Sequence, residues 1–365
     1  MYNSSITIII DILKRIVKYL ALNIRYIIEI FVEKGVNMKK ILSCLLSLLI
    51  ISFTLTGCVT NKNGKTLVRV NEVTHSIFYA PFYVAIEKGY FLDENIEIEL
   101  TNGGGADKSM TALLSNSADI GLMGPEAAIY VYLNGKENYP IIFAQLTQKD
   151  GSFLISRTKE TNFNYQDLIN KEIIAGRKGG VPAMTLEYLF NQKGLYNGKN
   201  INLNYDVQFA LTAAAFEGGT GDYCTLFEPT ASEFEEAGKG YVVASIGKES
   251  GEIPYTAFMA LNDYMNKNEE TIVGFVKAIK RGIEFTQTAS EEELVLALKN
   301  QFPGISDTSI IKSIRRYNEI GAWVNDITMK EEAFNRLQSV MQNANELSEK
   351  VSFEAITTSK YSNIK

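Results

Sequence analysis

Residues 67–254 alternate between short apolar runs with strand character and longer runs with helical periodicity. This alternation is typical of a parallel sheet that has helices on both faces, so it predicts an α/β protein. The predicted strands are Leu67–Val73, Ile96–Leu100, Asp119–Met123, Ile141–Gln145, Glu172–Gly176, Ile201–Tyr205, Tyr223–Phe227 and Tyr241–Ala244. The predicted helices are Pro81–Lys88, Lys108–Ser115, Pro125–Leu133, Pro182–Gln192, Phe209–Phe216 and Pro229–Glu236.

The order of elements restarts in the second half of this region. Residues 112–128 (ALLSNSADIGLMGPEAA) and 214–232 (AAFEGGTGDYCTLFEPTAS) both run from a helix through a small-residue turn and an Asp into a strand. In both, the strand is followed by a Pro that opens the next helix. The corresponding pairs are Asp119 with Asp222 and Pro125 with Pro229. We therefore expect two similar α/β lobes in one chain.

From Lys267 onward the pattern is purely helical, and helices can cover a lobe but cannot complete a sheet. The predicted helices of this tail are Glu269–Thr286, Glu291–Asn300, Asp307–Tyr317 and Lys330–Asn345. Before them, Thr256–Asn262 is predicted as one strand that returns from the second lobe to the first. The expected division is a first lobe of residues 67–148 and 257–350 and a second lobe of 151–254. The chain would cross between them near 149–152 and 254–257, with a cleft between the lobes.

Three cysteines and one histidine limit the available chemistry. They exclude a disulfide-rich scaffold and leave no His/Cys cluster for a zinc site, so we expect no metal and no cofactor. A Ser-His-Asp site would have to use His75, which we interpret as a polar rim residue rather than a base. The net charge of −6 argues against a nucleic-acid partner, which normally requires a basic face.

Residues 38–57 have the order of a bacterial lipoprotein signal peptide. Lys39 and Lys40 precede a mostly apolar run from Ile41 to Leu55, which is shorter than the roughly 20 residues that span a bilayer. The run ends in Leu-Thr-Gly-Cys, which resembles a lipobox. The resemblance implies cleavage before Cys58 and attachment of diacylglycerol to its sulfur.

The segments on either side of this signal also have predicted roles. We interpret residues 1–37 as a translated leader upstream of the true start at Met38, and residues 58–66 as a polar tether between lipid and domain. Residues 1–57 hold seven basic and three acidic residues, so the remaining chain has 29 basic and 39 acidic residues and a net charge of −10. With Cys58 lipidated, Cys224 has no partner for a disulfide.

The carboxyl ends of the predicted strands carry turns that combine Gly with a Pro or Asp opening a helix. In open α/β sheets ligands bind at these ends, where Gly allows a close approach and helix N-termini offer free N–H donors. A tight turn alone would explain any single case, but the whole set, on one side of both lobes, predicts a binding cleft. The candidate ligand-binding residues are Phe78, Tyr79, Gly104, Ala106, Gly124, Glu126, Thr147, Arg177, Gly179, Gly180, Phe227, Glu228 and Tyr255.

Several of these candidates allow a second interpretation. Glu126 and Glu228 either point at the ligand or complement the positive N-terminal end of a helix. Arg177 either binds the ligand or takes part in a surface salt bridge. Aromatic residues of the turns, such as Phe78 and Phe227, are better ligand candidates than those inside the helix that follows, which we assign to the core.

Three segments resemble one protein family, and the resemblance extends over residues 67–290. They are Tyr79–Leu100 (YAPFYVAIEKGYFLDENIEIEL), Gly103–Leu122 (GGGADKSMTALLSNSADIGL) and Arg177–Pro182 (RKGGVP). They look like the extracytoplasmic solute-binding proteins of nitrate, sulfonate, taurine and thiamine-pyrimidine ABC importers. The resemblance implies a type II periplasmic-binding-protein clamshell with two crossover strands and a helical C-terminal segment. It also implies no catalysis.

The partners follow from the same resemblance. A member of this family closes on one small molecule and delivers it to a membrane permease that is driven by cytosolic ATPases. With the lipobox, this implies a lipid-anchored protein on the outer face of the cytoplasmic membrane, and we expect a monomer.

Ligand class and rival functions complete the predictions. Two Glu at helix starts and several aromatic residues suit a flat ring with N–H donors, so a pyrimidine-precursor-like ligand ranks above a sulfonate, taurine or nitrate-type anion.

A pyrimidine-synthase-like enzyme on the same fold is the second hypothesis, but such enzymes are cytosolic and use a sacrificial His with cysteines. A surface adhesin is the third, and it would not need paired Gly-Pro turns around a cleft.

Overall fold

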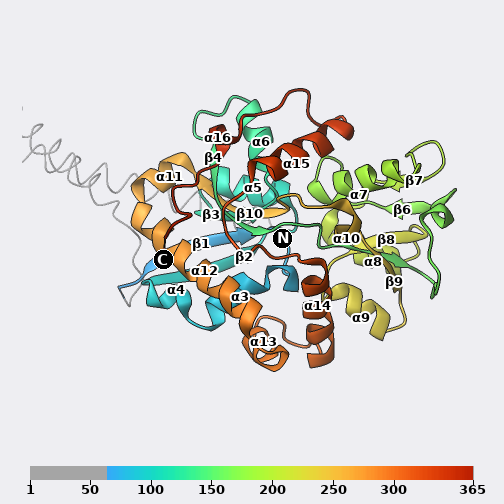
Figure 1. Cartoon of the computed structure of the whole chain (residues 1–365), viewed down its shortest axis with the longest axis horizontal. Coiled ribbons are helices and arrows are strands. Elements are labelled where there is room, and N and C mark those ends of the chain that lie inside the picture. Colours follow the sequence, from blue (N-terminus) through green and yellow to red (C-terminus); the bar gives the residue numbers. More distant parts are fainter. Residues whose placement is uncertain (1–63, 365) are drawn as a thin grey trace, which may run out of the picture. The chain divides into compact units, whose positions relative to one another are not determined.

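The computed structural model describes residues 64–364, which contain two five-stranded sheets flanked by helices (Figure 1). This arrangement confirms the predicted α/β class. The predicted leader, the signal peptide and Cys58 lie outside the described residues, as does most of the predicted tether. Within residues 64–364, no helix combines the length and the apolar character that a membrane crossing requires.

The first sheet has the strand order β2-β1-β3-β10-β4. Its strands are β1 (Thr66–Glu72), β2 (Ile96–Asn102), β3 (Ile120–Met123), β4 (Pro140–Thr147) and β10 (Thr256–Leu261). β1 pairs in parallel with β2 and β3, whereas β10 runs antiparallel between β3 and β4. The strand predicted to return from the second half of the chain therefore does complete the first sheet. All residues of β3 and β10 are buried, which explains their continuous apolar sequence.

Helices cover both faces of the first sheet. In Figure 1, α3 (Ala80–Glu87) and α12 (Glu269–Thr288) lie on one side of its strands, and α5 (Ala106–Leu114) and α6 (Glu126–Leu133) lie on the other. α3 and α12 pack directly on each other. They approach so closely at Gly282 that a Cβ there would overlap the backbone carbonyl of Pro81.

The second sheet has the strand order β7-β6-β8-β5-β9. Its strands are β5 (Phe153–Ser156), β6 (Glu172–Ile174), β7 (Asn202–Asn204), β8 (Tyr223–Leu226) and β9 (Tyr241–Ser245). β6 is parallel to β7 and β8, and β5 is antiparallel to β8 and β9. Its helical elements are η2 (Tyr165–Leu168), α7 (Val181–Gln192), η3 (Phe209–Leu211), α8 (Thr212–Glu217), α9 (Thr230–Glu236) and α10 (Ile246–Ser250).

The sequence interpretation missed β5. This strand has only four residues, and all four are buried, so it shows no alternation between apolar and polar positions. It also follows β4 after only five residues and contains no turn signal of its own. β5 follows the crossing predicted near 149–152 and runs antiparallel to β8 and β9, so the second sheet is mixed.

The internal repeat is visible as one matching hydrogen bond in each sheet. Asp119 Oδ2 accepts a hydrogen bond from the backbone N–H of Arg69 at 2.9 Å, and Asp222 Oδ2 accepts one from the backbone N–H of Glu172 at 2.9 Å. Each Asp lies just before one strand, and its hydrogen bond to the backbone of the neighbouring strand holds the two strands together. Asp119 also forms an ion pair of 2.6 Å with the Arg69 guanidinium.

The helical tail packs against elements of both sheets. It consists of α11 (Asn262–Lys267), α12, α13 (Glu291–Leu298), α14 (Asp307–Ile320), α15 (Glu331–Asn343) and α16 (Phe353–Ile356). α14 contacts both η1 (Ile77–Tyr79) and α9, and α15 contacts both α6 and α7. The predicted helical C-terminal segment is therefore confirmed, and it holds the parts built on the two sheets together.

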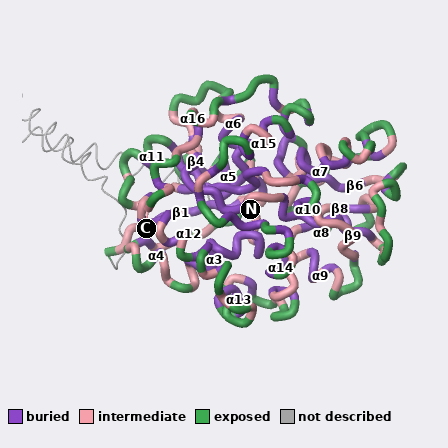
Figure 2. The backbone as a smooth tube through the Cα atoms, in the orientation of Figure 1, coloured by how far each residue is buried: buried purple, intermediate pink, exposed green. Residues whose placement is uncertain are grey.

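The chain passes between the sheets twice, between β4 and β5 and between β9 and β10. The strands lie in the buried centre of the fold, and most exposed backbone belongs to loops and outer helix faces (Figure 2). The described residues form one compact unit, so the predicted boundaries at 67–148, 257–350 and 151–254 stay a prediction. Below, first and second lobe mean the parts built on the first and second sheets.

Candidate ligand-binding site

A small pocket of about 40 Å³ lies where the two lobes meet. Four of the predicted residues line it, Ala106 and Glu126 from the first lobe and Arg177 and Gly180 from the second. The other lining residues are Val73, Gly105, Pro182 and Phe209. These residues follow the carboxyl ends of β1, β2, β3 and β6 or lie in η3, so the topology brings the predicted turns together. The pocket is far smaller than the roughly 300–1,000 Å³ of typical ligand sites, which means that the lobes are closed against each other.

Glu126 is the most buried charged group of this pocket. It opens α6, and only 1% of its surface is exposed. Its Oε1 accepts a weak hydrogen bond of 3.4 Å from the backbone N–H of Val181 in the second lobe. Its Oε2 is buried and has no hydrogen-bond partner within residues 64–364. Burial raises the pKa of Glu126 to about 7, and the positive charge of Arg177 opposes this rise only in part.

Gly124 is required beside this carboxylate. A Cβ at position 124 would overlap the Glu126 carboxyl group, so no other residue fits without moving it. Gly104, also predicted from the sequence, has a φ of +72° and would place a Cβ 3.5 Å from the Cβ of Ala210 in the second lobe. Gly124 therefore permits the close approach of the Glu126 carboxylate, and Gly104 permits the left-handed backbone of its turn.

Polar contacts from the second lobe close the pocket. Arg177 Nε lies 3.5 Å from Asp107 Oδ1, and both side chains are partly exposed. The Gly179 carbonyl accepts a hydrogen bond of 2.9 Å from the hydroxyl of Tyr130 on α6. Gly180 precedes the first residue of α7. The predicted Arg177–Pro182 loop therefore contacts the first lobe directly.

The aromatic candidates form one cluster behind the pocket. The ring of Phe78 lies 5.6 Å from those of Phe227 and Tyr255, 5.7 Å from Tyr79 and 5.1 Å from Tyr317, measured between centroids. Phe78 is fully buried, whereas Phe227 is half-buried and lines a neighbouring pocket of about 120 Å³. Of these rings, Phe227 is therefore the one most open to the cleft.

Thr147 and Glu228 are committed to other protein groups. The hydroxyl groups of Thr147 and Thr256 are hydrogen bonded at 2.6 Å, which ties β4 to β10. Glu228 is fully buried; its Oε1 lies 2.6 Å from Arg316 NH1, and its Oε2 accepts a hydrogen bond from the backbone N–H of Ser232. The structure therefore assigns the free carboxylate of the cleft to Glu126 and not to Glu228.

Asp150 is a buried carboxylate that sequence reasoning missed. It lies in the crossover between β4 and β5, and its Oδ1 accepts hydrogen bonds from the backbone N–H and the hydroxyl of Ser152. Burial raises the pKa of Asp150 to about 7, although the hydroxyls of Ser152 and Tyr255 oppose this rise. Burial, Asp150 and Glu126 together raise the pKa of Tyr255, which places both carboxylates near that ring. Lys149-Asp150-Gly151 has the composition of an ordinary turn, which contains no sign that its carboxylate is buried.

His75 belongs to a separate network. Its Nδ1 lies 2.7 Å from Glu72 Oε1, and its Nε2 donates to the carbonyl of Gln301 at 2.8 Å. The hydroxyl of Tyr83 donates to Glu72 Oε2 at 2.6 Å. The His75 ring therefore connects Glu72 at the end of β1 to the segment after α13, and it lines neither pocket of the cleft. The described residues contain no group of three or more His, Cys, Asp or Glu side chains that could hold a metal ion.

Comparison with known proteins identifies the family. The family described as NMT1/THI5 like matches residues 77–293. The chain belongs to this family. A Bacillus subtilis (strain 168) relative named "Putative binding protein YtlA" is 42% identical over 304 residues, which cover 83% of this chain and 91% of that protein.

Two solved structures are similar in fold at low sequence identity. The alkanesulfonate-binding protein SsuA from Xanthomonas axonopodis pv. citri, bound to MOPS, has a TM-score of 0.66 at 14% identity and covers 80% of this chain and 98% of its own. The ligand-binding component of an ABC-type import system from Staphylococcus aureus, with zinc bound, has a TM-score of 0.67 at 14% identity and covers 82% and 99%. They confirm the predicted periplasmic-binding-protein fold.

Proposed function

We propose that this chain is the substrate-binding subunit of an ABC importer and that it captures a small metabolite between its two lobes. The observation that carries the proposal is Glu126, a buried carboxylate with an unpartnered oxygen at the point where the lobes meet. The family, the binding-protein relative and the import-system neighbour support it. Because the closed pocket holds only about 40 Å³, the lobes must part to admit the ligand.

The ligand that we propose is a heteroaromatic, pyrimidine-precursor-like molecule with N–H donors. Glu126 lines the inter-lobe pocket, and its Oε2 is buried without a partner in the described part of the chain. A hydrogen bond from a ligand to a buried charged group contributes about 1.5–3 kcal/mol, and leaving that group unpaired costs a similar amount. A ring with amino groups supplies the missing donor, and Phe227 offers a flat surface for stacking.

The alternative ligand is a sulfonate, taurine or nitrate-type anion. Arg177 in the same pocket favours it, and one structure similar in fold is titled an alkanesulfonate-binding protein. The Arg177 guanidinium, however, already faces Asp107, and the buried Glu126 carboxylate in the same pocket would repel an anion. We therefore rank the donor-bearing ring first.

A pyrimidine-synthase-like enzyme gains no support from the cysteine of the described chain. Cys224 lies buried in β8, and burial raises the pKa of its thiol. A buried, protonated thiol is a poor nucleophile and metal ligand. The relative that is named a binding protein also supports a role without catalysis.

We further propose a lipid anchor at Cys58, on the outer face of the cytoplasmic membrane, with a permease and its cytosolic ATPase as partners. The lipobox-like Leu-Thr-Gly-Cys after an apolar run supports the anchor. The import-system neighbour supports the partners. We propose that the subunit acts as a monomer, as in the sequence-based expectation.

Calorimetry tests the proposed ligand class. The panel is an aminopyrimidine, taurine, an alkanesulfonate and nitrate, titrated into wild type, Glu126→Gln and the control Glu270→Gln, whose carboxylate is exposed. We expect the aminopyrimidine to bind wild type and the control equally and Glu126→Gln about tenfold or more weakly, because one charged hydrogen bond is lost. An anion that binds instead, and binds Glu126→Gln equally or better, would establish the alternative. Turnover of a pyrimidine without stable binding would refute the importer role.

A further inference from the structure

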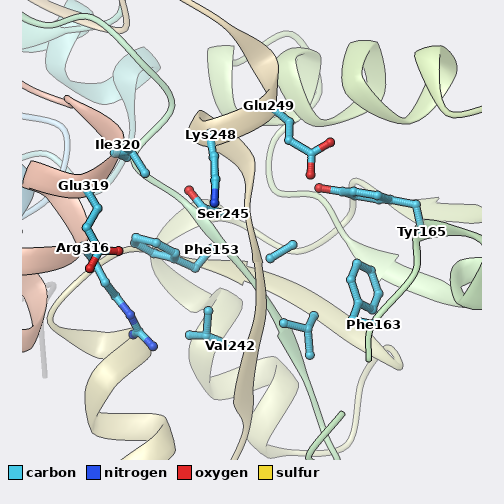
Figure 3. A pocket seen from close by; sticks show the side chains of 12 residues that line it. Phe153, Phe163, Tyr165, Val242, Ser245, Lys248, Glu249, Arg316, Glu319 and Ile320 are labelled. Atoms are coloured by element: carbon cyan, nitrogen blue, oxygen red, sulfur yellow. The ribbon is translucent and has the colours of Figure 1, made fainter. Parts of the chain in front are cut away.

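A second cavity, of about 440 Å³, lies outside the cleft (Figure 3). Its walls come from β5, β9, α10 and α14 and from the segment that contains Phe163 and Tyr165. It shares no lining residue with the two pockets of the cleft. Its volume falls within the roughly 300–1,000 Å³ of typical small-molecule sites. The cavity is therefore large enough for a ligand of its own.

One side of the cavity carries hydrogen-bond donors without partners. Lys248 on α10 makes no ion pair or hydrogen bond with any residue of 64–364, and its ammonium group extends toward Ser245 in the view of Figure 3. Ser245 Oγ is buried and also has no partner in that part of the chain. A cation beside a buried hydroxyl is a natural site for a carboxylate, since both groups donate to its oxygens.

The other charged groups of the cavity are already engaged or lie at its edge. Arg316 donates hydrogen bonds to Glu228 and Glu235, and its guanidinium stacks over the ring of Phe153 at 5.3 Å. Glu249 forms an ion pair with Lys193. Glu319 is exposed at the rim, where its negative charge disfavours a ligand with two anionic groups. One carboxylate on Lys248 is therefore the charge that the cavity accommodates.

Aromatic rings and the aliphatic residues Val242, Val243, Ala244 and Ile320 form the remaining walls. Phe153 is 2% exposed, and in Figure 3 it lies on one side of β9, with Phe163 and Tyr165 on the other. The rings of Phe163 and Tyr165 stand edge to face with centroids 5.3 Å apart. Such faces favour an aromatic ligand, which stacks or packs edge-on against them.

We propose that this cavity is a second binding site, for a small aromatic monocarboxylate. The carboxylate pairs with the ammonium group of Lys248 and accepts a hydrogen bond from the Ser245 hydroxyl. The aromatic ring packs on the side of β9 where Phe153, Ser245 and Lys248 lie in Figure 3. This site is independent of the ligand proposed for the cleft, and either proposal can fail without the other.

The probe is 3-phenylpropanoate, titrated up to about 10 mM, a range that covers weak single-ring ligands. Chemical-shift changes in ¹⁵N spectra of the whole domain locate its contacts. We expect saturable binding with shifts at Ser245 and Lys248, and at least tenfold weaker binding of 2-phenylethylamine, which lacks the carboxylate. Absence of saturable binding, or equal binding of the amine, would overturn the proposal.

Two substitutions separate this site from the cleft. Lys248→Gln should weaken binding of 3-phenylpropanoate about tenfold or more, whereas Lys267→Gln, an equally exposed lysine on α11, should leave it unchanged. Glu126→Gln should also leave it unchanged, because Glu126 lines only the cleft pocket. Equal affinity of the Lys248→Gln and Lys267→Gln variants, or loss of binding in Glu126→Gln, would reject the second site.

Discussion

Replacing Glu126 by Gln should stabilise the ligand-free protein at pH 8, although it removes a charge from the predicted binding site. Burial raises the pKa of this carboxyl from 4.5 to about 7, so the folded protein holds its proton more tightly than the unfolded chain. The stability gained from this proton is fully present below pH 4.5 and is lost as the pH rises through 7. A shift of this size corresponds to about 3 kcal/mol.

Gln resembles the protonated carboxyl in size and hydrogen bonding, so the variant should not lose this stability. We expect the free energy of unfolding to exceed that of wild type by about 3 kcal/mol at pH 8, and by less than about 1 kcal/mol at pH 5. Urea unfolding at both pH values measures the difference. The single tryptophan, Trp323, reports it, because its indole N–H donates to the Phe78 carbonyl at 2.9 Å.

Glu228→Gln is the matched control, because it makes the same chemical change in a buried carboxylate of the other lobe. Glu228 is paired with Arg316, so this variant removes one of the two carboxylates that pair with a partly buried guanidinium and leaves it only Glu235 among the described residues. Because Glu235 still pairs with Arg316, the loss of this one charged hydrogen bond should destabilise the protein by about 1.5–3 kcal/mol. Opposite signs for the two variants at pH 8 are the expected result. Destabilisation by Glu126→Gln at pH 8, or a difference from wild type that is independent of pH, would refute the reasoning.

Three further substitutions test the fold and the anchor. Gly282→Ala should cost about 1–3 kcal/mol or more in urea unfolding, because the new Cβ overlaps the Pro81 carbonyl; wild-type stability would contradict the α3–α12 contact. Asp119→Ala should cost about 1–3 kcal/mol, because the backbone N–H of Arg69 loses its acceptor; an unchanged midpoint would refute it. Cys58→Ala should release the protein from membranes into the soluble fraction of its bacterial host, and retention would reject the lipid anchor.

The alternation of strands and helices predicted most elements of the fold because each element carries its own period. The predicted return strand is β10, and the helical tail lies where its pattern placed it. β5 escaped prediction because four buried residues after a crossover show no period. Its position between β8 and β9 depends on partners some 70 to 90 residues away, which a local pattern does not contain.

The candidate site shows the same limit more sharply, because repeat and turn patterns locate a carboxylate without specifying its charge partner. Glu126 follows Pro125 and Glu228 precedes the corresponding Pro229, so the two are not equivalent in the repeat, but both stand at a helix start and both were predicted either to face the ligand or to complement the helix N-terminus. The two carboxylates differ in their charge partners because of α14, a helix of the tail that lies outside the internal repeat and contacts α9. Its Arg316 forms an ion pair with Glu228, whereas Glu126 forms none within residues 64–364 and is only partly compensated by the charge of Arg177 in the same pocket.

An unpaired buried carboxylate costs stability, so a binding role is the simplest reason to keep it. Arg316 of the helical tail pairs with Glu228, whose carboxylate lies outside the inter-lobe pocket, and not with Glu126, which lines that pocket. The tail thereby leaves the pocket one unsatisfied acceptor that a ligand with N–H donors can use. If Glu126→Gln both raises the free energy of unfolding and lowers ligand affinity, the same carboxylate destabilises the free protein and binds the ligand.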